Sequence, residues 1–390
     1  MKVKFSTLLK VSFVALLSLL FTCGFAKAVL FPVEISLYEQ RALNLMPAFD
    51  VEDYLSGSMQ TDMDAALGDQ IQFSSYYKKL YNEFMAIVDR FFEQMRSETR
   101  DRYICCRGEH FFNGHMVDKY EPLSQVRDEL TVTVEKLNEI QSMLPETKFY
   151  LYYVNNDTDV DFATGDNSGV YDYLAENLRF GEENCGKFSF DSFEEYEQYF
   201  YYSDHHWNHE GSYLAYTKLA QMLGHEKEML EPVELVAVPG IFHGSRTLRV
   251  GAQDSFDIMQ AYIFEYPPME VRVPDGSLTR YGDLDVLLER NPSEVSYVGV
   301  YGDNMGYMQL STGNAEKDNI LVIGDSYDNA LLKLLASHYN TTHSIDLRYY
   351  SYFMTEPFIF TEYVKENNIS SVLLVGSRIN FLELAKLEQW

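Results

Sequence analysis

The sequence predicts an α/β protein with a central, mostly parallel sheet and a β-rich insertion. The run from Lys148 to Val154 is apolar and aromatic without strict alternation, which is typical of a strand covered on both faces. Residues 320–323 and 371–375 have the same character and are separated by helical patterns. Between residues 232 and 318, short apolar runs alternate with Gly, Pro and Asp turns, which predicts the β-rich insertion.

Length and charge limit the possible functions. The chain has 390 residues, 46% of them hydrophobic, enough for one large α/β domain with insertions or for two smaller domains. Its formal net charge of -28 repels nucleic acid and anionic lipid headgroups, so no nucleic-acid partner is expected.

The N-terminus resembles a secretory signal. Lysines precede an apolar run from Val11 to Phe25, and Ala26-Lys27-Ala28 follows as a small-x-small cleavage site. Val29-Leu30-Phe31 extends the apolar run, so a retained membrane anchor is the alternative. We therefore expect residues 1–28 to be a signal peptide or an N-terminal anchor of an extracytoplasmic protein.

The rest of the chain divides into two predicted parts. Residues 29–118 are expected to be a membrane-proximal helical segment, with helical periodicity from Phe73 to Arg100. Residues 119–390 are expected to form the α/β domain, which includes the β-rich insertion at about 232–318 and begins with a helix at 122–144.

The cysteines do not form a scaffold. Beyond Cys23, the chain has Cys105, Cys106 and Cys185, so at most one internal bridge is expected, between Cys185 and one of the adjacent pair. No Cys-x-x-Cys spacing occurs, which argues against a structural zinc site.

One candidate nucleophile lies at the end of a predicted strand. Gly324-Asp325-Ser326 follows residues 320–323 and precedes a predicted helix, so the Ser326 hydroxyl is expected at the carboxyl edge of the sheet. Nearby backbone N–H groups can stabilise an oxyanion there. The alternative is that Asp325 and Ser326 only cap the helix.

A candidate base lies about 120 residues earlier. In Asp204-His205-His206-Trp207 a carboxylate two residues before an imidazole can fix its tautomer, and Trp207 can shield the pair from water. The alternative is a polar surface turn before a helix that Asn208 or Ser212 caps. Together the segments predict a serine-type triad, with Ser326 as nucleophile, His206 as base and Asp204 orienting the base.

A metal site is the competing interpretation of the histidines. His205 and His209 are four residues apart, with Asp204 and Glu210 beside them. A helix that starts near Asn208 separates the histidines, so a shared helical face is not expected. We predict neither a metal nor a cofactor.

The paired motifs also resemble a known family. Asp204-His205-His206-Trp207, followed by Gly211 and a helix, resembles the signature of DHHW proteins, which are similar to SGNH-hydrolase-like alginate O-acetyltransferases. In those enzymes an Asp-x-His-Trp motif precedes a Gly-Asp-Ser motif. The segment from Asp346 to Tyr350 resembles a further part of the family pattern. The resemblance implies an SGNH-hydrolase-like three-layer sandwich with Ser326, His206 and Asp204 as the triad.

The resemblance also implies further site residues. The expected oxyanion or substrate-binding residues are Gly324, Asp325, Tyr327, Arg348 and Trp207. The region 232–318 is not diagnostic of the family, so the polymer is left open.

The leading functional hypothesis is O-acyl transfer, most simply of acetyl, onto a cell-envelope polysaccharide or exopolysaccharide through an acyl-serine. An extracytoplasmic donor would require a membrane acyl-transporting partner. A carbohydrate esterase would use the same triad with water as acceptor. A non-catalytic envelope scaffold or binding protein and a zinc hydrolase are the remaining alternatives.

Overall fold

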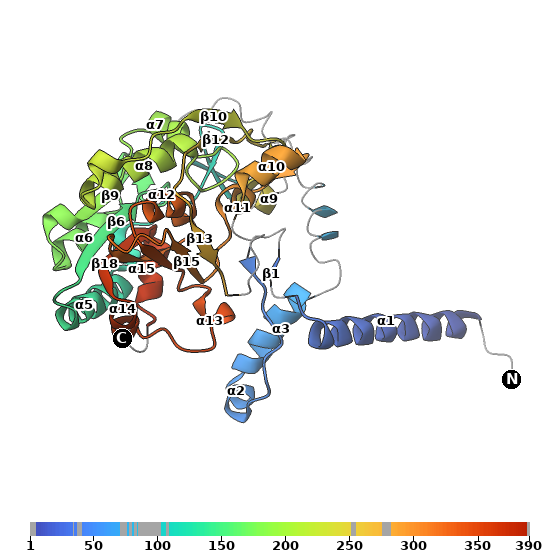
Figure 1. The fold of residues 1–390 in the computed structure, drawn as a ribbon. Coiled ribbons are helices and arrows are strands. Elements are labelled where there is room, and N and C mark those ends of the chain that lie inside the picture. Colours follow the sequence, from blue (N-terminus) through green and yellow to red (C-terminus); the bar gives the residue numbers. More distant parts are fainter. Residues whose placement is uncertain are drawn as a thin grey trace. The chain divides into compact units, whose positions relative to one another are not determined.

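The chain forms two compact units in the computed structural model (Figure 1), one made of Met1–Arg96 and Thr247–Gln253 and the other of Ser97–Arg246 and Asp254–Trp390. The structure describes residues 5–33, 35–36, 41–70, 76–77, 80–81, 84, 103–106, 109–250, 255–274 and 282–387.

The first unit begins with the long apolar helix α1 (Phe5–Leu30). Its segment Lys10–Leu30 is long and apolar enough to cross a membrane, with a mean hydropathy of 2.1, as a signal sequence also is. Two short strands and two helices follow: β1 (Ile35–Ser36), β2 (Arg41–Ala42), α2 (Val51–Ser56) and α3 (Ser58–Gln70). The Gln70 side chain joins these pieces, because it bonds both the N–H and the C=O of Val33. The helix predicted at 73–100 lies mostly outside the described residues.

The second unit is built on a 7-stranded sheet in the order β13-β15-β17-β16-β18-β6-β9. From β17 to β9 every neighbouring pair is parallel, and β13 and β15 are added antiparallel at one edge. The predicted α/β class with a mainly parallel sheet is confirmed. The strands are β6 (Lys148–Val154), β9 (Cys185–Phe188), β13 (Glu270–Arg272), β15 (Tyr307–Ser311), β16 (Asn319–Gly324), β17 (Thr341–Ile345) and β18 (Ile369–Gly376).

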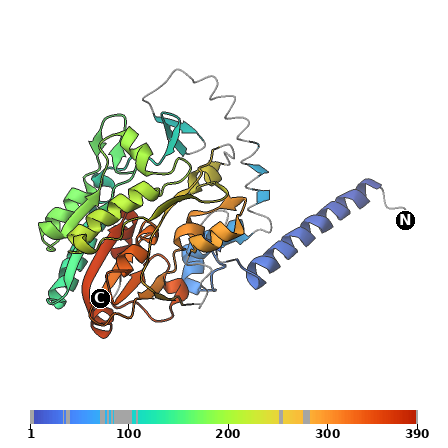
Figure 2. The ribbon, with the colours of Figure 1, turned by 45° about the horizontal axis from the view of Figure 1, so that its top comes forward.

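Both faces of this sheet are buried, which explains the unbroken apolar runs. Ile320 and Val322 of β16 belong to a core cluster with α8 and α12, whereas Leu321 and Ile323 belong to a cluster with α5, α6, α14 and α15 (Figure 1, Figure 2). Successive residues of a strand face opposite sides, so each side needs apolar residues when helices cover both. The helices are α5 (Arg127–Met143), α6 (Val170–Asn177), α8 (His209–Met222), α12 (Leu332–Ala336), α14 (Phe360–Glu366) and α15 (Arg378–Leu384).

The region 232–318 contains helices as well as strands. Asp283 and Ser296 begin two of these helices, because their side chains accept backbone N–H groups in the first turn. Two strands, β13 and β15, join the main sheet itself. The other elements of the region are β10 (Glu234–Ala237), β11 (Ile241–Phe242), α9 (Ser245–Val250), β12 (Gln260–Ile263), α10 (Leu284–Arg290), β14 (Glu294–Val295) and α11 (Tyr297–Tyr301).

The disulfide expectation was wrong for Cys185. Its thiol is free, and the residue lies in β9, where it pairs with Leu151 in the main sheet. Cys105 and Cys106 belong to a separate 3-stranded sheet, in which β3 pairs antiparallel with β4. The remaining small elements are β3 (Tyr103–Cys106), β4 (Glu109–Phe112), β5 (His115–Val117), β7 (Val160–Asp161), β8 (Asp166–Asn167), α7 (Phe193–Tyr199) and α13 (Tyr350–Phe353).

Candidate active site

The Asp204–His206 segment is a tight loop between α7 and α8. An antiparallel bridge between Phe200 and Trp207 closes the loop, and the Tyr201 N–H donates to the His206 carbonyl at 3.1 Å. Asn208 then caps α8 by accepting from two backbone N–H groups, in agreement with the sequence signal. The loop is therefore fixed at both ends by backbone hydrogen bonds.

The carboxylate and the imidazole of this loop are in direct contact. His206 Nδ1 lies 2.5 Å from Asp204 Oδ1, and the His206 backbone N–H donates to the same oxygen at 2.9 Å. Asp204 is completely buried, and His206 is 5% exposed. Because Asp204 accepts at Nδ1, the neutral imidazole carries its proton there, and Nε2 is left as the acceptor.

A second segment, which the sequence analysis did not identify, holds Asp204 from the other side. The Ser245 N–H donates to Asp204 Oδ2 at 2.6 Å, and Arg246 Nη1 donates to the Asp204 carbonyl at 3.1 Å. Gly244 passes so close to this loop that a Cβ on it would overlap the backbone of Ser203. Ser245 and Arg246 lie 41 and 42 residues after Asp204 in the sequence. In the sequence, Gly244 is the only residue that indicates this close approach.

The environment of Asp204 favours its ionised form. Burial alone would raise its pKa, but the adjacent imidazoles of His205 and His206 and the hydrogen bonds it accepts hold the pKa of Asp204 well below its usual range. The carboxylate therefore stays charged at neutral pH.

Tyr297 is a further residue of the site that sequence reasoning missed. Its ring is stacked on the His206 ring, with centroids 3.9 Å apart and planes inclined by 9°. Tyr297 is 1% exposed and begins α11 immediately after its cap Ser296. The stack fixes the imidazole plane. His206 Nε2 is buried and has no hydrogen-bond partner among the described residues.

Ser326 occupies the turn that follows β16, as the sequence predicted. Its side chain is nearly buried, at 7% exposure, and no described residue forms a hydrogen bond with its Oγ. Asp325 shapes the turn, because its carboxylate accepts from the Ser377 N–H and hydroxyl and from the Tyr327 N–H. At Gly324 a Cβ would overlap the Asp328 carboxyl group, so the turn requires glycine there.

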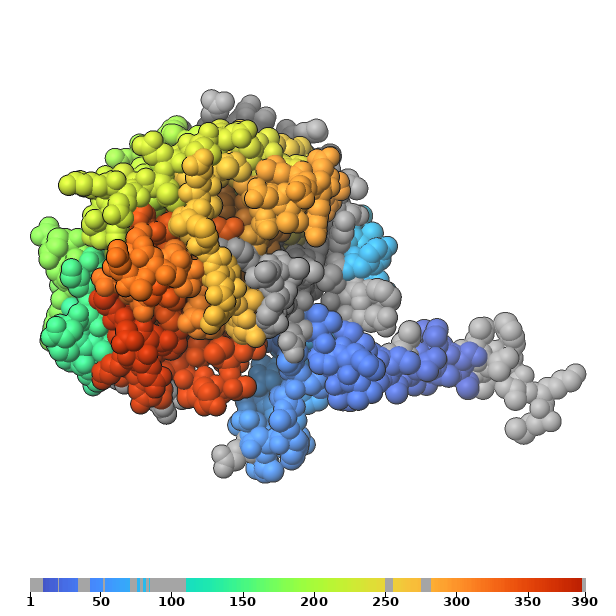
Figure 3. Space-filling view, viewed as in Figure 1, coloured from blue at the N-terminus to red at the C-terminus, as the bar shows by residue number. Residues whose placement is uncertain are grey.

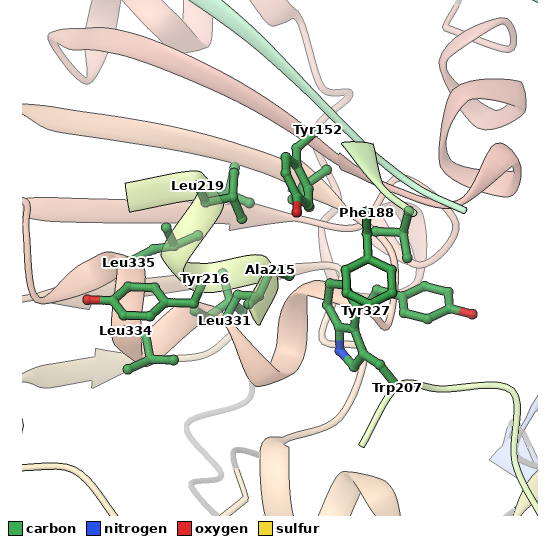
Figure 4. Packing of buried hydrophobic residues seen from close by; sticks show 14 of the residues in the cluster. Tyr152, Phe188, Trp207, Ala215, Tyr216, Leu219, Tyr327, Leu331, Leu334 and Leu335 are labelled. Carbon is green, nitrogen blue, oxygen red and sulfur yellow. The ribbon is translucent and has the colours of Figure 1, made fainter. Parts of the chain in front are cut away.

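Tyr327 connects the two motifs, which lie 122 residues apart. Its hydroxyl donates to the His205 carbonyl at 2.7 Å, and its ring centroid lies 5.4 Å from that of His206. Trp207 packs edge-on against Tyr327 at 5.2 Å, and Figure 4 shows both rings in one buried cluster beside Phe188. The structure thus brings Asp204, His206, Trp207 and Tyr327 together, and Ser326 is the residue next to Tyr327.

Arg348 follows β17 and is held by a carboxylate. It forms a bidentate pair with Asp346, with Nε and Nη2 at 2.9 and 2.6 Å from the two oxygens. Its side chain is 21% exposed. Burial opposes its charge, but Asp346, and more weakly Asp325, raise its pKa, so Arg348 remains a cation beside the serine turn.

The buried Asp328 is expected to make the stability of the protein depend on pH. Burial and the carboxylates of Asp346 and Asp325 raise the pKa of Asp328 well above the usual 3.8. Above pH 3.8 the folded state holds a proton that the unfolded state releases, so this residue costs stability as pH rises. We expect Asp328→Asn to stabilise the protein at pH 7 by about 1 kcal/mol or more, since one pKa unit is worth about 1.4 kcal/mol.

Urea denaturation at pH 4 and pH 8 would measure this effect. The gain should be small at pH 4 and larger at pH 8, while Asp191→Asn, at an exposed position, should change neither. Equal stabilisation at both pH values would contradict the raised pKa.

The residues proposed for a metal site are engaged in other contacts. Ligand atoms of Asp204, His205 and His206 lie within 4.8 Å of one another. However, His206 Nδ1 bonds Asp204 and His205 Nδ1 bonds the Ser245 hydroxyl at 2.9 Å. His209 packs against Tyr262, with ring centroids 4.9 Å apart. Among the described residues, the Nδ1 atoms of His205 and His206 are therefore occupied by hydrogen bonds within the protein.

Fold and site together define an α/β protein in which the turn after β16 carries Ser326, and Tyr327 in the same turn contacts the loop that holds Asp204 and His206. No protein-family model and no curated protein matches the chain. Solved structures match in fold. A DHHW family protein from Eubacterium siraeum is 16% identical with a TM-score of 0.55, over 74% of this chain and 97% of that protein.

Bacillus cereus PatB1 is similar to the same degree. It is 16% identical with a TM-score of 0.53, over 74% of this chain and 99% of PatB1. The O-acetyltransferase domain of Pseudomonas putida AlgJ is 11% identical with a TM-score of 0.39, over 72% of this chain and 92% of that domain. The resemblance to DHHW proteins predicted from the sequence is therefore confirmed at the level of the fold.

Proposed function

We propose that the chain is an extracytoplasmic serine-dependent O-acyltransferase that acts on a cell-envelope polysaccharide or exopolysaccharide. The observation that carries the proposal is the buried Asp204–His206 hydrogen bond, which leaves Nε2 as an acceptor. Tyr327, the residue after Ser326, has its ring centroid 5.4 Å from that of His206. The arrangement agrees with the SGNH-hydrolase-like three-layer architecture expected from the motifs, with helices on both faces of the sheet.

In the first half of the reaction, His206 Nε2 removes the proton from Ser326 Oγ while Oγ attacks the carbonyl carbon of the acyl donor. The carbonyl electrons move to oxygen, and the backbone N–H of Ser326 together with the Arg348 guanidinium stabilises the resulting oxyanion. When the tetrahedral intermediate collapses, the bond to the leaving group breaks and His206 returns the proton to it. The product is an acyl-serine.

In the second half, a sugar hydroxyl takes the place of the leaving group. His206 removes its proton, the sugar oxygen attacks the acyl-serine carbonyl, and the same groups hold the oxyanion. Ser326 then leaves and recovers its proton from His206. Asp204 remains ionised throughout and stabilises the imidazolium in both halves, because its pKa is held well below the usual range.

A solved neighbour and the N-terminal helix give further support. PatB1 has been captured with a sulfonyl adduct, and sulfonyl reagents react with activated nucleophiles of the kind proposed here for Ser326. Helix α1 is suited to hold the chain at a membrane, where a membrane acyl-transporting partner would deliver the donor.

Intact-mass measurement of the full chain tests the proposal. After incubation with an aryl acetate, we expect the wild type to gain one acetyl group and Ser326→Ala to gain none. Ser337→Ala removes a buried serine whose hydroxyl only bonds the Lys333 carbonyl, and it should label as the wild type does. Transfer of the label to an added oligosaccharide supports the transferase. Loss of the label to water alone favours the esterase, and no label would overturn both.

A further inference from the structure

Two cavities share His209 in their walls. The larger, of about 240 Å³, extends from His115 and Tyr202 to Gln260 at the start of β12. The other, of about 160 Å³, continues along β12 to Lys333. Figure 3 shows this second cavity as a hollow between the gold surface near β12 and the orange surface of α10. We call the two cavities together the β12 groove.

The β12 groove is lined by connected aromatic rings. In the smaller cavity Tyr213 contacts Tyr262 and Phe264, with centroids 5.5 and 5.8 Å apart, and Phe264 contacts Tyr266 at 5.7 Å. Tyr202, which is 37% exposed, lines the other cavity. Aromatic faces bind the apolar faces of sugar rings, and tyrosine hydroxyls can bond sugar hydroxyls. A row of such rings suits a linear chain of sugars.

The charge of the β12 groove restricts which sugars it accepts. Glu197 and Asp257 line one cavity, and Asp283 and Asp285 line the other. Its one lysine is Lys333, and burial lowers the pKa of that group. With a net charge of -28 on the whole chain, an anionic polymer would be repelled from this surface.

The smaller cavity of the β12 groove is also lined by residues that are close in sequence to the proposed nucleophile. Asn329 and Ala330 line the smaller cavity and follow Ser326 by three and four residues. Asn329 is held in place by bonds from its side chain to the Gly302 carbonyl and to Asn304, both at 3.1 Å. The wall of the smaller cavity therefore includes part of the segment that follows Ser326 in the chain.

From these observations we propose that the β12 groove binds the acceptor, and that this acceptor is a linear glycan of neutral or amino-bearing sugars, without carboxylates. That the bound glycan is the acyl acceptor rests on the proposed function, whereas glycan binding itself does not. The elements β12 and α10 of the region 232–318 would then determine substrate specificity.

Titration calorimetry with the full-length Ser326→Ala variant tests the inference without any turnover. The probes are a soluble oligomer of N-acetylglucosamine, its de-N-acetylated counterpart and an oligogalacturonate of equal length. We expect the neutral oligomer to bind, the amine to bind more tightly, and the carboxylated oligomer to bind at least about tenfold more weakly than the neutral one.

Two added substitutions locate the binding. Tyr262→Ala should weaken binding of the neutral oligomer by about tenfold or more, whereas Tyr54→Ala, at an exposed position on α2, should not. Asp285 is exposed, so Asp285→Lys keeps the fold and should shift preference from the amine toward the carboxylated oligomer.

The outcomes separate this inference from the proposed function. If Ser326 is acetylated but no oligomer binds, or Tyr262→Ala and Asp285→Lys change nothing, the β12 groove assignment is wrong and the acyl-serine stands. If the oligomers bind as expected but Ser326 is never acetylated, the groove is a glycan-binding site and the transferase is wrong. Equal affinity for the oligogalacturonate would overturn the charge argument.

Discussion

Asp204→Asn is expected to lower the rate of acyl transfer by about 10³- to 10⁴-fold, the order found when the carboxylate of a serine triad is replaced by an amide. All three groups that bond the Asp204 carboxylate are donors: His206 Nδ1–H, the His206 N–H and the Ser245 N–H. An amide has only one oxygen, so its NH₂ must face a donor on one side.

Either orientation of the amide damages the site. If the NH₂ faces His206, it donates to Nδ1 and moves the imidazole proton to Nε2, which then cannot accept the Ser326 proton. If it faces Ser245, the backbone N–H loses its partner, and no charge remains to stabilise the imidazolium. The loss should appear in kcat as well as in kcat/KM, because the interaction is needed in the transition state.

A matched control separates chemistry from folding. Ser245→Ala keeps the backbone N–H that bonds Asp204 and removes only the hydroxyl that contacts His205, so it should retain most of the activity. Circular dichroism should show that Asp204→Asn is folded. An Asp204→Asn variant with more than about a tenth of the wild-type rate would mean that Asp204 does not orient the base.

The sequence predicted those parts of the molecule that depend on local pattern. Strand β16 follows from four consecutive apolar residues that face helices on both sides, and the Asp204–His206 contact joins residues two positions apart. The Asn208 cap and the turn at Gly324 are also local. The chemistry of such short-range features is present in a few adjacent residues.

Long-range contacts could not be predicted in this way. Tyr297 stacks on His206 from 91 residues later, and nothing in the helix that bears it marks a catalytic contact. Ser245 and Arg246 reach Asp204 because Gly244 allows their segment to approach the loop closely. This segment lies in a region that the sequence predicted to be β-rich. In the same region, the only sequence signal for each of the helices α10 and α11 is one capping side chain. The turn-forming residues around them indicate strands and turns more strongly.

Arg246→Met is expected to destabilise the protein by about 3 to 5 kcal/mol, the cost of leaving a buried charge without its partner. Arg246 is completely buried and donates to the carboxylates of Asp157 and Asp118. It also donates to three further oxygens: the Met116 carbonyl, the Tyr196 hydroxyl and the Asp204 carbonyl. Methionine fills the space but leaves these acceptors unpaired.

The loss should depend on pH, because Asp157 titrates. Burial raises the pKa of Asp157 to about 6 even though Arg246 opposes the shift. Without Arg246 the pKa rises further. Between pH 4 and that higher value the folded state keeps a proton that the unfolded state releases, so stability falls as pH rises. Arg246→Met should therefore be much less stable at pH 8 than at pH 5.

Asp157→Asn in the Arg246→Met background identifies the cause. The double variant removes the buried carboxylate, so it should regain much of the lost stability at pH 8 and little at pH 5. The double-mutant cycle is measured by urea denaturation, at both pH values, of the wild type, Arg246→Met, Asp157→Asn and the double variant. If the double variant is no more stable than Arg246→Met at pH 8, the charge of Asp157 is not what Arg246 balances. Its role would then be to hold the Asp204 carbonyl and the loop that carries His206.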